Sequence, residues 1–162
     1  MNDMKRALEK GNFKVAESDK KETYTLHYPS EYLKNGYFNG NNVIKPELLL
    51  GLAKSMADIL KTDEQGKRNS HIAKSQLRKF YDFVCDTEQD LTHKVIDERT
   101  AISEIVRLDS WANESVSKGK ATREFYRFIH DNVNAVVKAD TAEAVTAFKK
   151  HFEAIICYYP ER

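Results

Sequence analysis

The sequence predicts an all-α protein: a compact bundle of about five helices, preceded by a loosely ordered N-terminal arm. Glycine and proline are scarce, at six and three residues in a chain of 162, whereas a β-sandwich or barrel needs frequent turns. From Pro46 onward, apolar residues recur at the spacing of one helix face, and no convincing strand or internal repeat interrupts them. A helix with one apolar stripe needs that stripe covered, so we expect the helices to pack together.

The chain is long enough to form a single folded domain without disulfides or a metal, since a chain of this size buries roughly 70% of its unfolded surface. Residues 1–44 differ from the rest, because they are polar, contain scattered Gly, Asn and Tyr, and show no sustained period. This composition predicts a flexible arm. Residues 45–162 are expected to form the helical-bundle domain.

The first helix of the bundle is expected within residues 45–61, where Pro46 stands in the first turn. A charged loop follows over residues 62–70, and a second helix is expected over about 75–85 or slightly more. A third helix is expected within residues 91–112. Its apolar positions are Val95, Ile102, Ile105, Val106 and Leu108.

Residues 113–120 contain a glycine with several hydroxyl and amide side chains, and they predict a break in the helices. A fourth helix is expected from about Thr122. In the last helix, Asp140 and Glu143 stand at capping-box spacing, although Thr141 is an alternative cap. The expected core positions of this helix are Phe148, Phe152, Ile155 and Ile156.

The net charge of +1 favours no particular partner, so any nucleic-acid binding must use a local patch. The two cysteines, Cys85 and Cys157, are far apart in apolar helical patterns and are expected to be reduced and buried. The first ten residues lack the apolar run of a signal peptide, and no stretch approaches 18 apolar residues. We therefore expect a cytoplasmic protein without a membrane partner.

Little in the sequence points to catalysis. The five histidines (His27, His71, His93, His130 and His151) form no zinc-binding motif. The phosphate-binding glycine motifs and the nucleophile motif G-x-S-x-G do not occur. The acidic residues Asp86, Glu88 and Asp90 are most simply a solvated face. We expect no enzymatic activity, no metal and no cofactor; an enzyme whose site assembles from distant His and acidic residues is the alternative.

Two groups of basic residues stand out. The first comprises Lys67, Arg68, Lys74, Arg78 and Lys79, and the second comprises Lys118, Lys120, Arg123 and Arg127. Within these groups, two pairs lie one helical turn apart and so share a face. The simplest interpretation is solvated helix faces. The sharper hypothesis is that the clusters form a groove for a phosphate backbone, with Tyr81, Trp111 and Tyr126 as candidates for base stacking, although aromatics at this spacing are more often core.

Several segments resemble the small subunit of the type III-A CRISPR effector (Csm) complex. KSQLRKFYDFV at 74–84 is similar to that family's S-x-[LI]-R-x-[FL] segment, and GYFNGNNVIKPELLLGLAKSMADIL before it is similar to the family's lead-in. IVRLDSWANESVSKGK and the ending FKKHFEAIICYYPER at 148–162 match further family segments in order and spacing. The likeness spans about residues 36–162 and omits the preceding arm.

The resemblance implies an all-helical, non-catalytic protein that self-associates along a ribonucleoprotein filament, lines the groove where guide RNA pairs with target RNA, and contacts the target backbone. Its further implied partners are the backbone and large subunits of the effector, and its role is antiviral defence. Carried onto this chain, Arg78 is the principal RNA contact, Lys74 and Lys79 are its neighbours, and Arg107 matches a basic residue before the aromatic Trp111. The family's Gly-Arg after that aromatic is replaced here by NESVSKGK, where Lys118 or Lys120 is the substitute.

Another class of function stays open. A purely architectural helical adaptor would dock another protein through exposed apolar residues and contact no RNA. The last two tyrosines, Tyr158 and Tyr159, are candidates for such an interface because aromatics are enriched there.

Overall fold

Five α-helices and one short 3-10 helix make up the computed structural model, which describes residues 27–61 and 72–160. No strand occurs in those residues, and the sole β-bridge joins Phe38 to Ile44. The all-α prediction is confirmed. The elements are η1 (Pro46–Leu49), α2 (Gly51–Leu60), α3 (Lys74–Thr92), α4 (Glu98–Ser117), α5 (Arg123–Ala139) and α6 (Ala142–Tyr158).

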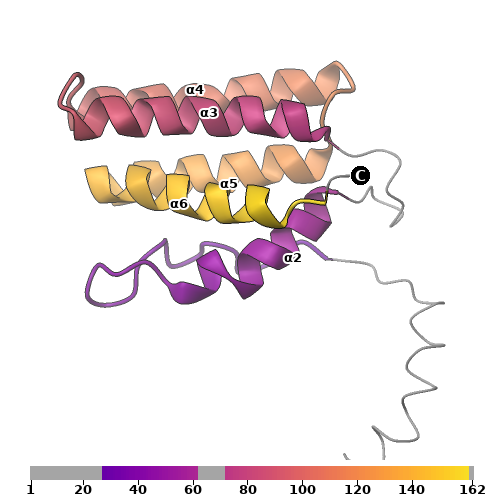
Figure 1. Ribbon diagram of the computed structural model, residues 1–162, viewed down its shortest axis with the longest axis horizontal. Helices are drawn as coiled ribbons and strands as arrows, with labels where there is room; N and C mark the ends of the chain where they lie inside the picture. The colour runs from indigo at the N-terminus through magenta and orange to yellow at the C-terminus, as the bar shows by residue number, and fades with distance from the viewer. Residues whose placement is uncertain (1–26, 62–71, 161–162) are drawn as a thin grey trace, which may run out of the picture.

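The helices form layers (Figure 1). The α3–α4 pair makes one layer, the α5–α6 pair lies beneath it, and α2 with the segment before it covers the other side of α6. Successive helices from α3 to α6 run in alternating directions, because the turns between them are short. As a result, α3 and α5 begin at the same end of the bundle, where α4 and α6 finish.

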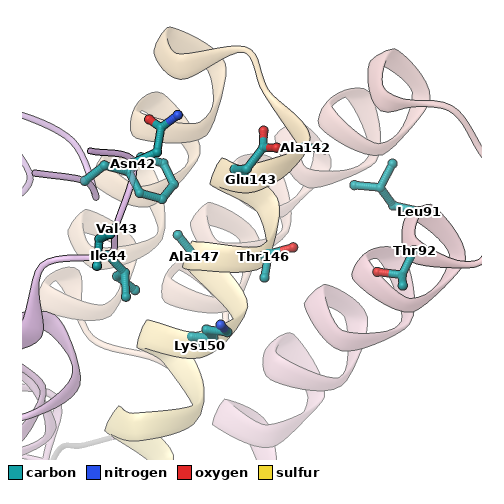
Figure 2. Close-up of a pocket in the computed structure, with 11 residues that line it drawn as sticks. Asn42, Val43, Ile44, Leu91, Thr92, Ala142, Glu143, Thr146, Ala147 and Lys150 are labelled. Carbon is teal, nitrogen blue, oxygen red and sulfur yellow. The ribbon is translucent and has the colours of Figure 1, made fainter. Parts of the chain in front are cut away.

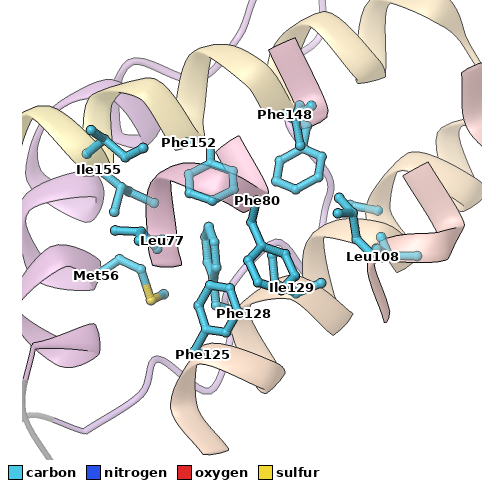
Figure 3. Packing of buried hydrophobic residues seen from close by; sticks show 14 of the residues in the cluster. Met56, Leu77, Phe80, Leu108, Phe125, Phe128, Ile129, Phe148, Phe152 and Ile155 are labelled. Atoms are coloured by element: carbon cyan, nitrogen blue, oxygen red, sulfur yellow. The ribbon is translucent and has the colours of Figure 1, made fainter. Parts of the chain in front are cut away.

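Phenylalanines from α3, α5 and α6 form the centre of the core (Figure 3). The ring centroids of Phe80 and Phe125 are 4.9 Å apart and those of Phe128 and Phe152 are 5.2 Å apart, both in edge-to-face packing. The expected core positions of the last helix are confirmed, since Phe148, Phe152, Ile155 and Ile156 are all buried. Of the two closing tyrosines, Tyr159 is buried and donates a hydrogen bond to the carbonyl of Ile72, whereas Tyr158 is 39% exposed.

Side-chain caps fix the starts of three helices. The carboxylate of Asp97 accepts a hydrogen bond from the Thr100 amide at 2.8 Å, and the hydrogen bonds from Thr100 hold the pKa of Asp97 below its usual value. Thr122 caps α5 and Thr141 caps α6 in the same way. The alternative of Thr141 as cap is therefore right. Asp140 instead ends α5 in the left-handed conformation, with φ of 54°.

Three expected helix boundaries differ from those of the structure. The second helix continues past residue 85 to Thr92, because tertiary contacts hold this segment: Thr87 is buried and Glu88 accepts a hydrogen bond from Thr146 of α6. The third helix starts only at Glu98, and Val95 lies in the preceding turn with 70% of its surface exposed. That helix also continues through the expected break to Ser117, because Ser115 is buried against α3 and accepts a hydrogen bond from Gln76.

A buried hydrogen-bond network ties the segment before the helices to the core. The hydroxyl of Tyr32 lies 2.6 Å from Nε2 of His151, whose Nδ1 lies 2.6 Å from the carbonyl oxygen of Leu48. The side-chain amide of Asn132 donates to the Tyr32 hydroxyl at 2.9 Å and accepts from the Tyr37 hydroxyl at 2.7 Å. Every member of the network is thus satisfied, as buried polar groups require.

Residues 27–44 therefore pack against the bundle through Tyr32 and Tyr37, both of which are buried. Residues 1–26 lie outside the described part of the chain. The division of the chain at residue 44 stays a prediction. The division was predicted because residues 1–44 show no helical periodicity. Isolated aromatic residues in a turn-rich segment can pack into a core without producing such a periodicity.

The expectation of two buried thiols is wrong for Cys157, which is exposed on the outer face of α6. Cys85 is half-buried on α3. Both cysteines are free.

Candidate nucleic-acid interface

Basic residues occupy the first turns of α3 and α5 and the turn after α4. Figure 1 shows that these segments lie at one end of the bundle. We call this the basic end. It carries Lys74, Arg78, Lys79, Lys118, Lys120, Arg123 and Arg127. These are seven of the ten basic residues singled out in the sequence.

The α3 part of the basic end comes from the first turns of that helix. Lys74 is the first residue of α3 and Arg78 follows one turn later, so the two share a helix face. Arg78 and Lys79 are exposed, and Lys74 is half-buried. The residue before α3, Ala73, provides no side-chain cap. The start of α3 thus combines a helix N-terminus with cations, an arrangement suited to an anion.

The turn between α4 and α5 brings two further lysines to this end. Gly119 adopts φ of 72°, which lets the chain reverse there. Lys118 pairs with Glu114 one turn earlier at 3.1 Å, and both side chains are exposed. Lys120 and Arg123 are exposed as well. Glu124, the acid that interrupts the second basic group, has one buried oxygen with no hydrogen-bond partner in the described part of the chain.

Arg127 also contacts the segment that precedes the helices. Its guanidinium lies 4.1 Å from the ring centroid of Tyr28, and the hydroxyl of Tyr28 donates to Asp131 at 2.7 Å. The Arg127 side chain therefore helps to hold the segment before the bundle, in addition to contributing charge. Sequence reasoning missed Tyr28, because nothing in a non-periodic segment shows which helix it contacts.

The other three basic residues singled out in the sequence are not part of the basic end as the structure describes it. Arg107 is in the middle of α4, where it pairs with Glu104 at 2.8 Å and its guanidinium lies 4.7 Å from the ring centroid of Trp111. The resemblance linked Arg107 to Trp111, and the two side chains are in contact. Lys67 and Arg68 fall within residues 62–71, outside the described part of the chain.

The opposite end of the bundle carries more acidic than basic side chains. Among the described residues, the exposed acids there are Asp86, Asp90, Asp97, Glu98, Asp140 and Glu143, and the exposed cations include Lys94, Arg99, Lys138 and Lys150. Glu88 is partly buried: it accepts a hydrogen bond from Thr146 at 3.0 Å and lies 3.9 Å from Lys149. Within the described bundle, basic groups thus concentrate at one end and acidic groups are in excess at the other.

The three aromatic candidates differ in environment. Tyr81 packs edge-to-face on Phe152, so it belongs to the margin of the core. The hydroxyl of Tyr126 donates to Asp109 at 3.1 Å. Trp111 is half-buried, and its ring packs edge-to-face on that of Phe83 at 5.0 Å.

The histidines do not assemble into a metal or catalytic site in residues 27–61 and 72–160, where no group of three or more His, Cys, Asp or Glu is placed to hold a metal ion. His130 lies 2.7 Å from Asp109 and links α5 to α4. His151 is buried in the network with Tyr32, and burial lowers its pKa to about 4. It therefore stays neutral and serves packing.

A cavity of about 470 Å³ opens at the acidic end, between the turn at residues 38–44, the end of α3 and the start of α6 (Figure 2). Val43, Ile44 and Leu91 give it an apolar lining, and its charged groups are Glu143 and Lys150. These two charges of opposite sign offer no cluster for general acid–base chemistry.

None of the described helices is both long and apolar enough to cross a membrane. The cytoplasmic location expected from the sequence stays a prediction.

In a comparison with protein-family models, residues 45–160 match the model described as Csm2 Type III-A. This range covers the whole bundle from η1 to α6 and all ten candidate basic residues. Searches of curated proteins and of solved structures gave no match. Because the family model covers most of the chain, the chain belongs to the Csm2 type III-A family, whose members are small subunits of the type III-A CRISPR effector (Csm) complex.

Proposed function

We propose that this protein is a non-catalytic subunit of the type III-A effector, where it contacts the RNA backbone through the basic end. The observation that carries the proposal is the placement of cations from α3, from the α4–α5 turn and from α5 at one end of the bundle. Phosphate binding needs positive charge within a short distance and no particular base. Family membership supports assembly with the other effector subunits.

The geometry favours a strand that crosses the end of the bundle. Helices α3 and α5 occupy diagonal corners of the four-helix arrangement α3–α6, since each packs on α4 and α6. Lys74 and Arg78 on α3 are therefore at the opposite corner of the basic end from Arg123 and Arg127 on α5. The lysines of the α4–α5 turn lie between these two corners, because α4 packs on both α3 and α5.

We further propose that guide and target RNA are the strands concerned, and that copies of the chain associate along them with the backbone and large subunits. Each copy offers few phosphate contacts, so a single copy binds RNA weakly and affinity accumulates when several copies share one strand. The acidic end repels phosphate, which orients each copy with its basic end on the RNA.

The experiment compares two matched double variants of α3. In the first, Lys74 and Arg78 are replaced by Ala; in the second, Asp86 and Asp90 are replaced by Asn. Both change two charges spaced one turn apart on the same helix. RNA affinity is measured over a series of salt concentrations, with helical content checked by circular dichroism.

The first variant is expected to bind RNA more weakly. Its plot of log K against log salt is expected to be shallower, with the magnitude of the negative slope reduced by about 1.4, or about 0.7 for each lost phosphate contact with a single strand. The second variant is expected to change RNA affinity much less than the first, because Asp86 and Asp90 lie about 12 and 18 Å along α3 from Arg78, beyond the Debye length of about 10 Å at 0.1 M salt. An unchanged slope in the first variant contradicts the proposal and favours the architectural adaptor.

A further inference from the structure

We propose that the groove between α3 and α4 holds one unstacked base of the bound RNA, in contact with Phe83 and Trp111. The groove has a volume of about 300 Å³ and lies in the half of the α3–α4 layer next to the basic end. This inference rests on the proposed function, since it assumes that an RNA strand reaches the basic end. It goes beyond it by naming a base site and the side chains that form it.

The aromatic lining is the first argument. Phe83 from α3 and Trp111 from α4 both line the groove and are only half-buried, so each ring keeps some surface toward the solvent. Their centroids are 5.0 Å apart with an interplanar angle of 78°, so together they form a corner and not a closed stack. Bases of single-stranded RNA bind such rings because every base has an apolar face to bury.

The polar lining is the second argument. Gln76 and Ser115 line the groove and are joined by a hydrogen bond of 3.1 Å from the Gln76 amide to the Ser115 hydroxyl. The carbonyl oxygen of the Gln76 side chain remains an acceptor for an N–H group of a base. A few polar groups in a largely apolar pocket are typical of sites that orient a small planar ligand.

The charge around the groove is the third argument, and it selects a nucleotide over an apolar side chain. Lys79 is exposed and lines the groove, and Arg78 precedes it on the basic end. On the α4 side, Arg107 lies over the Trp111 ring at 4.7 Å. The acid in the lining, Glu114, is paired with Lys118 at 3.1 Å, which offsets its charge. A base in this groove would leave its phosphate among cations.

The test uses the intrinsic fluorescence of Trp111, which is the one tryptophan in the chain. The full-length protein is titrated with a single-stranded oligouridylate and with an abasic oligonucleotide of the same length, which keeps the phosphates and lacks the bases. Binding is followed separately by anisotropy of a dye on the oligonucleotide. We expect the oligouridylate to quench the emission and to bind roughly tenfold more tightly than the abasic strand.

A variant pair locates the effect. Phe83→Leu removes one ring and keeps the site apolar, so it is expected to abolish the preference for the oligouridylate while leaving binding of the abasic strand unchanged. Tyr158→Leu is the control, because Tyr158 is an exposed aromatic outside the groove. It is expected to behave like the native protein.

The outcomes are distinguishable. If both strands bind equally and the emission is unchanged, the base site is wrong while RNA binding by the basic end stands. If neither strand binds, the proposed function itself fails. If the emission changes only when the other effector subunits are added without RNA, the groove receives a protein side chain and the proposal is overturned.

Discussion

The hydroxyl of Tyr32 and Nε2 of His151 lie 2.6 Å apart in the protein interior, although 119 residues separate them along the chain. Because Nδ1 of His151 faces the carbonyl of Leu48, the imidazole donates from Nδ1 and accepts at Nε2 from the tyrosine. This contact joins the segment before the bundle to the last helix. It also makes the protonation state of one histidine matter for stability.

Stability is expected to fall as the pH drops from about 6.5 to about 4. Burial lowers the pKa of His151 from 6.5 to about 4, so the unfolded chain takes up a proton that the folded protein refuses. The contribution of His151 to the free energy of unfolding is fully present above pH 6.5. It is lost progressively down to pH 4, by about 3 kcal/mol in total. Urea unfolding at several pH values measures it.

The variant His151→Phe separates this effect from that of the carboxylates. It is expected to be less stable at pH 7 and to lose less stability on acidification than the native protein. Equal pH dependence in the two proteins would show that His151 does not titrate as described.

Tyr32→Phe is expected to lower the free energy of unfolding by about 1–3 kcal/mol, because Nε2 of His151 and the amide of Asn132 both lose a buried partner. Tyr158→Phe removes a hydroxyl from a residue that is 39% exposed and is the matched control, with a change within about 0.5 kcal/mol. Denaturant titration of both variants decides, and equal stabilities would mean that the buried network contributes nothing.

Tyr37→Ala is expected to cost about 3–5 kcal/mol, since its ring is 1% exposed and its hydroxyl bonds Asn132. Lys34→Ala is the control: Lys34 lies three residues earlier and its side chain is exposed, so this substitution is expected to leave the stability nearly unchanged. The comparison of thermal midpoints tests whether residues 27–44 belong to the cooperative fold. A neutral Tyr37→Ala would place this segment outside the fold, as a flexible arm.

Longer RNA is expected to bind more tightly per site than short RNA. On a strand of about 10 nucleotides one copy binds through a few phosphates, whereas on about 40 nucleotides neighbouring copies share the strand and associate. Anisotropy titrations with the two lengths measure the difference. Identical affinity per site would count against association along the strand.

Periodicity was enough to predict the helices and the core of the last helix, because Phe148 and Phe152 repeat at helical spacing and are both buried. It was not enough for the contacts of Tyr32 and Tyr37, whose partners lie about 100 residues away. The sequence also located the basic groups, but the short turns between helices are what bring Arg78 and Arg123 to one end. The groove beside Trp111 depends on how α3 and α4 pack, which no local pattern reveals.

We propose above all that this protein binds RNA as a subunit of a type III-A effector. The most direct measurement is affinity purification of the tagged protein from its native cell, with sequencing of the retained RNA and identification of the retained proteins. We expect guide RNA and several CRISPR effector subunits, with less RNA retained by the Lys74 and Arg78 double variant. Recovery of the protein alone, or with unrelated partners and no RNA, would contradict the claim.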